Sequence, residues 1–343
     1  IFNFIVVVLK NKGGRMTKLT PNDFSSNLPI KWCPGCGDYA ILNSVKKSMA
    51  ELGIDHEKYV VVSGIGCSSR FPYYVNTYGY HTIHGRAIPV ATGIKLSNPE
   101  LTVFVVTGDG DCLSIGGNHF IHGIRRNIGL KVLMFNNRIY ALTKGQASPT
   151  TLPGARTKTT PFGSTDYPFN PMLFAVGMRA PFVARSIDID INGTSSIITA
   201  AAKNEGFAFV EILQKCVVFT DKEFDVFKNP ETKDDMIVRI EDKKPMIFGK
   251  NRNKAIVVEN NTPKIVEFEP SLVPSNLTIY DSSDVNLAYI ISSLMPPEFP
   301  LPLGIFLRFA KTSYENLFYD SVKDISTPSS VEEILRESIY EIK

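Results

Sequence analysis

The chain has 343 residues, of which 43% are hydrophobic and 21% charged, and its formal net charge is +3. These values are ordinary for a globular protein of one large or two modest domains, and so small a net charge gives no reason to expect a nucleic-acid partner. No apolar run approaches the roughly 20 residues that a membrane-spanning helix needs, so we expect a cytoplasmic protein without a membrane anchor.

The first 15 residues do not follow the pattern of the rest of the chain. A short apolar run comes first and basic residues come after it. A signal peptide has the opposite order and ends in small residues. The stretch from Lys12 to Met16 back-translates to purine-rich bases directly before an ATG codon. We therefore expect residues 1–15 to be an untranslated leader or disordered, and Met16 to be the natural start.

Four of the five cysteines are at positions that could bring their thiols together in the fold. Cys33 and Cys36 form a Cys-x-x-Cys pair in WCPGCG, directly before a predicted helix over 40–52. Such pairs serve as redox dithiols, zinc ligands or iron–sulfur ligands, and no predicted strand precedes this one as it does in redox proteins. Cys67 and Cys216 each follow a short buried strand, predicted over 59–63 and 207–213.

A four-thiolate site would take its other two ligands from these strand ends. Isolated cysteines are also common as small buried hydrophobes, and Cys112 is expected to be one. A disulfide framework is not expected in a long chain without a secretory signal.

The most informative stretch begins at a predicted strand over 101–106. Its continuous β-branched run is typical of a strand buried on both faces of a parallel sheet. The turn Gly-Asp-Gly-Asp at 108–111 follows it, and we expect one helix from this turn to about Arg126. A second buried strand, predicted over 131–135, ends in two asparagines, the second of which is Asn137.

Asp109 and Asn137 should therefore reach the same C-terminal edge of a parallel sheet, where ligands of open α/β sheets bind. Their carboxylate and amide oxygens suit Mg²⁺, which brings substrate phosphates as further ligands. A glycine turn at a helix start suits a phosphate. The 28-residue spacing between the two residues resembles the thiamine diphosphate signature.

Taken together, these motifs resemble the β subunits of the 2-oxoacid:ferredoxin oxidoreductases. WCPGCG, GIGCSSRFPYY, HTIHGRA with ATGIK, and GDGD with the paired asparagines occur in that family in this order, between about 30 and 216. The resemblance implies a doubly wound, mostly parallel α/β sheet of the thiamine diphosphate-binding type over 16–216. It implies thiamine diphosphate, Mg²⁺ and one [4Fe–4S] cluster as cofactors.

The resemblance also assigns roles to individual residues. The implied cluster ligands are Cys33, Cys36, Cys67 and Cys216. The implied Mg²⁺ ligands are Asp109, Asn137 and the carbonyl of Ile139. The implied cofactor contacts are Cys36, His84, Gly108, Asp109, Gly110, Asp111, Asn137, Ile139, Leu142 and Thr143.

Substrate binding is implied for three further side chains, which we treat as candidate catalytic residues. Arg70 resembles the basic residue that meets the 2-oxoacid, and its guanidinium suits a carboxylate. Leu142 and Lys144 lie on the substrate side in family members that act on 2-oxoglutarate or on several 2-oxoacids. Strict pyruvate enzymes often differ there.

The remaining segments predict structure but no chemistry. A Thr-, Pro- and Gly-rich stretch over 147–171 predicts a loop or lid over the site. The strand ending before Cys216 is expected to close the sheet, and residues 217–343 to form an extension that contacts another subunit or covers the cluster. The other elements that we expect are helix 195–203, strands 256–259 and 265–268, helix 281–295, strand 304–309 and a last helix from a capping box at Ser330.

The expected reaction is oxidative decarboxylation of 2-oxoglutarate, pyruvate or 2-oxobutyrate to acyl-CoA and CO₂, with coenzyme A as acyl acceptor and ferredoxin as electron acceptor. No segment resembles the pyrimidine-binding domain that carries the family's activating glutamate. We therefore expect an α subunit to supply it and this chain to be inactive alone. The alternatives are a pyruvate- or aryl-pyruvate-specific member, a cluster-free thiamine decarboxylase or synthase, and a non-catalytic zinc module.

Overall fold

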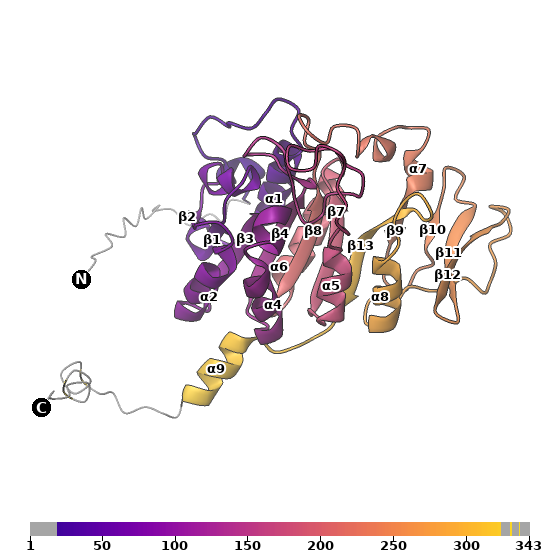
Figure 1. Ribbon diagram of the computed structural model, residues 1–343. Coiled ribbons are helices and arrows are strands. Elements are labelled where there is room, and N and C mark those ends of the chain that lie inside the picture. The colour runs from indigo at the N-terminus through magenta and orange to yellow at the C-terminus, as the bar shows by residue number, and fades with distance from the viewer. Residues whose placement is uncertain (1–18, 324–329, 331–335, 337–343) are drawn as a thin grey trace, which may run out of the picture.

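The structure, a computed structural model, describes residues 19–323 together with Ser330 and Arg336. An eight-stranded sheet runs through its centre (Figure 1). Its strands are β1 (Tyr59–Ser63), β2 (Tyr78–His81), β3 (Thr102–Gly108), β4 (Leu130–Asn136), β7 (Phe182–Ile187), β8 (Ala208–Leu213), β9 (Ile237–Ile240) and β13 (Leu301–Arg308). The order across the sheet is β2-β1-β3-β4-β8-β7-β13-β9. All neighbours are parallel except β13 and β7, which confirms the predicted mostly parallel sheet.

Helices cover both faces of this sheet. One face carries α1 (Asp38–Leu52) and α6 (Ile191–Lys203). The other carries α2 (Ala87–Ser97), α4 (Gly117–Arg126), α5 (Pro171–Gly177) and α8 (Val285–Ser292). Successive strand side chains alternate between the two cores, so that Val61 packs toward α1 while Val60 and Val62 pack toward α2. Two-sided burial explains why these strands have continuous apolar sequences.

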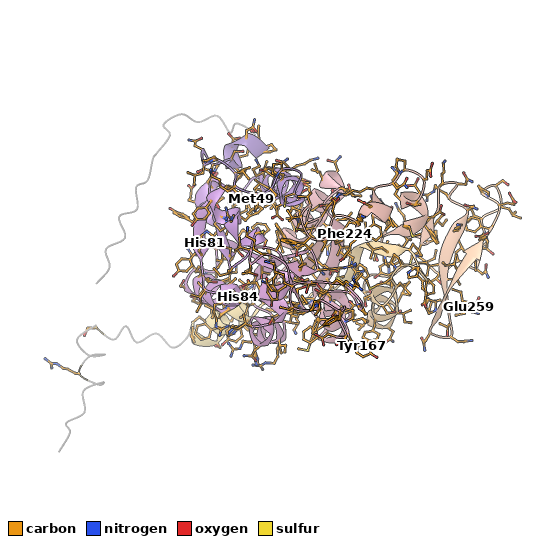
Figure 2. The ribbon with its side chains drawn as sticks, turned by 45° about the horizontal axis from the view of Figure 1, so that its top comes forward. Met49, His81, His84, Tyr167, Phe224 and Glu259 are labelled. Atoms are coloured by element: carbon orange, nitrogen blue, oxygen red, sulfur yellow. The ribbon has the colours of Figure 1, made fainter. Side chains whose placement is uncertain are left out.

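The sheet extends beyond the strand that was expected to close it. β8 lies in the interior, and β7, β13 and β9 follow it, so two strands from the region after residue 216 complete the sheet. Phe224 and Phe227 join this region to the end of β8, where Leu213 is buried with them. Figure 2 labels Phe224 among the side chains. The expectation that the sheet closes before Cys216 is therefore wrong.

A helix was also predicted to run unbroken from the Gly-Asp-Gly-Asp turn to Arg126. The structure has a short helix, α3 (Asp109–Leu113), followed by a break and then α4. The break brings Gly116 against the backbone of Asp111, where a Cβ atom would lie 2.4 Å from the carbonyl oxygen. Only glycine allows this approach, so the chain can fold back over the turn.

Smaller elements complete the fold. The strands predicted near 256–259 and 265–268 form an antiparallel pair within a small sheet. The remaining strands are β5 (Ile139–Tyr140), β6 (Gln146–Ala147), β10 (Ile247–Phe248), β11 (Lys254–Glu259) and β12 (Thr262–Glu267). Within residues 19–323, the remaining helices are α7 (Lys233–Met236), α9 (Tyr314–Val322) and the 3₁₀ turns η1 (Pro21–Phe24), η2 (His56–Lys58), η3 (Ser68–Tyr73) and η4 (Asp225–Phe227).

Two predictions fall outside the described part of the chain. These are the leader over 1–15 with Met16 as the start, and most of the last helix from Ser330. In the described ranges, no helix has both the length and the apolar character needed to cross a bilayer.

Candidate active site

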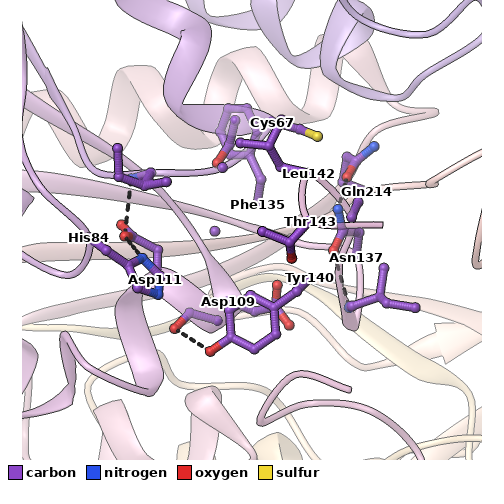
Figure 3. Close-up of a pocket in the computed structure, with 17 residues that line it drawn as sticks. Cys67, His84, Asp109, Asp111, Phe135, Asn137, Tyr140, Leu142, Thr143 and Gln214 are labelled. Carbon is purple, nitrogen blue, oxygen red and sulfur yellow. Dashed lines mark hydrogen bonds and ion pairs between the residues drawn. The ribbon is translucent and has the colours of Figure 1, made fainter. Parts of the chain in front are cut away.

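A cavity of about 230 Å³ lies at the C-terminal ends of β1, β3 and β4. Its wall comes from the loops after these strands and from the β5–β6 turn, together with His84 after β2 and Gln214 after β8 (Figure 3). In the sheet, β2 lies on one side of β1 and β3 lies on the other side. The order of the strands therefore reverses next to β1, and the cavity lies at this point. Ligands of doubly wound sheets bind at such reversal points. The lining residues are Ile65, Gly66, Cys67, Ser68, His84, Gly108, Asp109, Gly110, Asp111, Phe135, Asn137, Ile139, Tyr140, Ala141, Leu142, Thr143 and Gln214.

Asp109 stands at the first position of α3 and is 2% exposed. Its Oδ2 accepts hydrogen bonds from the hydroxyls of Ser148 and Thr150, each at 2.6 Å. Burial raises the pKa of its carboxyl to about 6, and the two hydroxyls oppose that rise because they favour the charged form. A buried carboxylate held in this way is a suitable ligand for a hard cation.

Asp111 holds the wall of the cavity together. Its Oδ1 accepts from the amides of Ile65 at 3.1 Å and Gly85 at 2.7 Å, and Oδ2 accepts from the Thr107 hydroxyl at 2.7 Å. Oδ1 also lies 2.6 Å from Nδ1 of His84. One carboxylate thus joins the loops after β1, β2 and β3 and orients the imidazole, whose ring lines the cavity. Nδ1 is engaged, and Nε2 is the nitrogen left for a ligand.

Asn137 follows β4 on the opposite wall. Its Oδ1 accepts from the Ile139 amide at 3.2 Å, and its Nδ2 donates to Gln214 at 2.9 Å. Across the cavity the ring of Tyr140 lies against Gly110, where a Cβ atom would lie 2.1 Å from it. The glycine in the turn is therefore required by packing, because no larger residue fits under this ring.

The segments that carry the predicted cluster cysteines lie next to each other. The indole Nε1 of Trp32 donates to the Cys67 carbonyl at 2.7 Å. The amide of Gly37 donates to the Lys215 carbonyl at 3.2 Å, directly before Cys216. The loop of the first cysteine pair is thus fixed to both of the other strand ends.

The thiols are also close enough to influence one another. Burial raises the pKa of Cys67 to about 12, with smaller contributions from Asp38, Cys216 and Cys33. Burial likewise raises the pKa of Cys36, and Asp38 and two neighbouring thiols add to it. Within residues 19–323, no three histidine, cysteine, aspartate or glutamate side chains already form a metal-binding group. Four neighbouring sulfur donors would suit iron–sulfur or zinc better than a hard cation.

The structure brings most of the predicted cofactor contacts together and leaves five predicted residues outside the cavity wall: Cys33, Cys36, Arg70, Lys144 and Cys216. Cys36 lies behind Gln214, whose Nε2 contacts its Sγ at 3.3 Å. Arg70 lies half-buried in η3, next to Cys67. Lys144 is exposed in the β5–β6 turn with a φ of 80°. The predicted residues that do line the cavity are Cys67, His84, Gly108, Asp109, Gly110, Asp111, Asn137, Ile139, Leu142 and Thr143.

Sequence reasoning missed four side chains that shape the site: Ser148, Thr150, Tyr140 and Gln214. Gln214 follows β8 two residues before Cys216, and a polar residue at a strand end is a recognisable signal. Ser148 and Thr150 lie in a loop that composition identified only as a loop.

Comparisons with known proteins identify the family of this chain. Residues 64–212 match the thiamine pyrophosphate enzyme, C-terminal TPP binding domain. The chain is 46% identical over 297 residues to the 2-oxoglutarate oxidoreductase subunit KorB of Mycobacterium tuberculosis, covering 86% of this chain and 79% of that one. It is 45% identical over 199 residues to the 2-oxoacid:ferredoxin oxidoreductase 2 subunit beta of Aeropyrum pernix, covering 58% of this chain and 64% of that one.

A solved structure is similar over nearly the whole chain. It is the 2-oxoglutarate:ferredoxin oxidoreductase from Magnetococcus marinus, with 2-oxoglutarate, coenzyme A and succinyl-CoA bound. The TM-score is 0.76 at 32% identity, covering 95% of this chain and 98% of that one. The chain therefore belongs to the β subunits of the 2-oxoacid:ferredoxin oxidoreductases, an oxidoreductase family, and carries a thiamine diphosphate-binding domain.

Proposed function

We propose that this chain, together with an α subunit, oxidatively decarboxylates 2-oxoacids to acyl-CoA and CO₂. Each turnover would release two electrons, taken singly by two ferredoxin molecules, and one proton. One observation carries the proposal. Two donor sets of different chemistry, the oxygens of Asp109 and Asn137 and the sulfurs of four cysteines, lie along one edge of one sheet.

The oxygen donors fit a metal diphosphate. Asp109 and Asn137, with the Ile139 carbonyl, would hold Mg²⁺, and the turn at the start of α3 would face the phosphates. His84 would contact the cofactor through Nε2, because Asp111 engages its other nitrogen. When bound, thiamine diphosphate supplies an electron sink for decarboxylation, and an iron–sulfur cluster supplies a one-electron acceptor.

The sulfur donors fit a [4Fe–4S] cluster held by Cys33, Cys36, Cys67 and Cys216. The mutual influence of their thiols supports this set. We also propose that part of residues 217–343, the predicted extension beyond 16–216, helps to cover the cluster, while β9 and β13 of this region belong to the central sheet. In support of this role, a Cβ atom added to Gly35 would lie 3.5 Å from Cγ1 of Val217, so the chain after Cys216 packs close to the loop of the first cysteine pair.

An α subunit would complete the site. Ile65 and Leu142 line the cavity, yet they are 44% and 41% exposed, and Ile83 next to His84 is 74% exposed. Exposed apolar side chains around a cavity are typical of a surface that another protein covers. The α subunit would bring the activating glutamate that this chain has no recognisable segment to carry.

The substrate range would include 2-oxoglutarate, pyruvate and 2-oxobutyrate. Arg70 would bind the carboxylate common to all 2-oxoacids, and Lys144 the second carboxylate of 2-oxoglutarate. The name of the Mycobacterium tuberculosis relative supports 2-oxoglutarate, as do the compounds in the Magnetococcus marinus structure. Selective turnover of pyruvate or of aryl-pyruvates would instead indicate a narrower member of the family.

Iron content tests the central claim. The complex purified with its α subunit under anaerobic conditions should contain about four iron atoms per β chain and absorb near 400 nm, as expected for a four-iron cluster. Cys67→Ser should lose both signals. Cys112→Ser is the matched control, because this buried thiol lies in α3 beside the cavity and is not one of the four.

Each contrary result identifies an alternative. Zinc in place of iron would indicate a zinc module. Thiamine diphosphate binding without iron would indicate a cluster-free thiamine enzyme. Full iron in the Cys67→Ser complex would mean that the ligand set is wrong.

A further inference from the structure

Gln214 is the first residue after β8, and its side chain touches a residue of each donor set. Its Oε1 accepts a hydrogen bond from Nδ2 of Asn137 at 2.9 Å (Figure 3). Its Nε2 donates to Sγ of Cys36 at 3.3 Å. The residue is 1% exposed, so water does not compete for these contacts.

The orientation of this amide is determined by its surroundings. Nε2 also lies 2.5 Å from the carbonyl oxygen of Lys215. A carbonyl can only accept, so the atom facing it must be the NH₂ group. The same NH₂ group therefore faces the sulfur, and the oxygen faces Asn137.

The backbone holds the side chain in this place. The amide of Gln214 donates to the carbonyl of Asn136 at 2.9 Å, which ties it to the end of β4. The carbonyl of the next residue, Lys215, accepts a hydrogen bond from the Gly37 amide at 3.2 Å. This bond joins the segment of Gln214 to the loop of the first cysteine pair. These two bonds fix the backbone at Gln214 between the segment that carries Asn137 and the segment that carries Cys36.

We propose that Gln214 is a positioning residue that couples the metal diphosphate site to the iron–sulfur site. This inference rests on the proposed function and adds a residue to it. Its Oε1 would hold the Asn137 amide so that the Oδ1 atom faces the cavity. Its Nε2 would direct the positive end of an N–H dipole at the Cys36 sulfur.

The second contact has a measurable consequence. A hydrogen bond to a ligating sulfur stabilises the more negative, reduced form of a cluster, so it raises the reduction potential. The first contact has another consequence, because a ligand whose orientation is lost binds its metal less tightly. One side chain should thus control two quantities that are measured independently.

Two substitutions separate these effects in the complex with the α subunit. Gln214→Leu removes both hydrogen bonds, so the cluster potential should fall and the dissociation constant for thiamine diphosphate with Mg²⁺ should rise roughly tenfold. Gln214→Glu keeps an oxygen for Asn137 but replaces the donor facing the sulfur by an acceptor. Its cluster potential should fall at least as far, while its cofactor affinity stays closer to that of the wild type.

Potentiometric titration followed by electron paramagnetic resonance measures the first quantity, and calorimetry the second. Thr199→Val serves as control, because it deletes a buried hydroxyl on α6 that contacts Ser48 and Glu51, neither of which belongs to a donor set or holds one. It should change neither quantity.

An unchanged potential in an iron-loaded Gln214→Leu complex would overturn the sulfur contact. Unchanged cofactor affinity would overturn the coupling. If Gln214→Leu loses iron, Gln214→Asn replaces it, because its shorter side chain cannot reach both partners. Absence of iron from the wild-type complex would overturn the proposed function, and the calorimetric comparison would still decide whether Gln214 holds Asn137.

Discussion

The hydroxyl of Thr150 lies 2.6 Å from Oδ2 of Asp109, although the two residues belong to different parts of the fold. Asp109 begins α3 after β3, whereas Thr150 lies in the loop that follows β6. The same hydroxyl lies 2.8 Å from Oδ1 of Asn136 at the end of β4. The loop predicted as a lid thus contacts the ends of both strands that carry the oxygen donors.

This relationship predicts the effect of removing one hydroxyl. Thr150→Val keeps the shape of the side chain and leaves Asp109 with one hydroxyl donor, Ser148. The carboxylate should lose its fixed orientation, and thiamine diphosphate with Mg²⁺ should bind roughly tenfold more weakly, a cost of about 1.4 kcal/mol. Calorimetry on the complex with the α subunit measures the change.

Two further variants complete this test. Thr150→Ser restores a hydroxyl and should recover most of the affinity. Thr160→Val, farther along the same loop, should leave the affinity unchanged, because its hydroxyl reaches the Ala155 carbonyl and not the carboxylate. Equal effects of Thr150→Val and Thr160→Val would mean that the loop matters only for stability.

Asp111 should matter for folding more than for direct cofactor contact. Its carboxylate accepts from two amides, one hydroxyl and the imidazole of His84. Asp111→Asn places an NH₂ group where some of these donors point, so it should lower the free energy of unfolding by about 2–3 kcal/mol. Thermal unfolding measures this loss. Asp166→Asn, at an exposed position, is the control and should have no effect.

Local sequence patterns predicted the central strands because these strands are buried on both faces. The strand over 59–63 was predicted at its observed bounds, and those near 101–106, 131–135 and 207–213 within two residues. β7 was missed because its sequence contains Arg185. That side chain pairs with Glu211 on β8 at 2.6 Å, and a contact 26 residues away cannot be read from local periodicity.

The candidate site also has residues that could be predicted from the sequence and residues that could not. The Gly-Asp-Gly-Asp turn and Asn137 could be predicted because strand ends of a parallel sheet share one edge. The contacts made by Thr150 and Gln214 could not, since they depend on how loops fold back over that edge. Arg70 and Lys144 were named from the resemblance alone, and their roles stay predictions.

The buried side chain of Lys131 should make the stability of the protein depend on pH. It lies in β4, is 5% exposed and donates to the Gly206 carbonyl at 2.9 Å. Burial lowers its pKa from 10.5 to about 7. Between these values the unfolded chain binds more protons than the folded chain, so this group makes the protein more stable as the pH rises from 7 toward 10.5.

The test compares the wild type with Lys131→Met across this range. The unfolding free energy of the wild type should increase relative to the variant by about 2–4 kcal/mol between pH 7 and 10, because one pKa unit corresponds to about 1.4 kcal/mol. Other titrating groups are common to both proteins and cancel in the difference. A constant difference across this range would mean that Lys131 titrates normally.

Substrate choice provides the last prediction. Arg70→Ala should impair every 2-oxoacid alike, because all share the carboxylate that this residue is proposed to bind. Lys144→Ala should impair 2-oxoglutarate more than pyruvate, since pyruvate has no second carboxylate for the ammonium group. Loss of such a charge-assisted contact costs about 1.5–3 kcal/mol, or roughly 10- to 150-fold in kcat/KM.

Steady-state assays of the complex with 2-oxoglutarate and with pyruvate test this prediction. Lys158→Ala is the matched control, because Lys158 is also exposed and its amide donates to the carbonyl of Gly145, next to Lys144. It should change kcat/KM for neither substrate, since the resemblance places Lys144 and not Lys158 on the substrate side. If Lys144→Ala reduced kcat/KM equally for 2-oxoglutarate and pyruvate, Lys144 would act on something common to both reactions. Its left-handed backbone conformation, with a φ of 80°, would then point to a role in shaping the β5–β6 turn that carries Leu142 and Thr143 to the cavity.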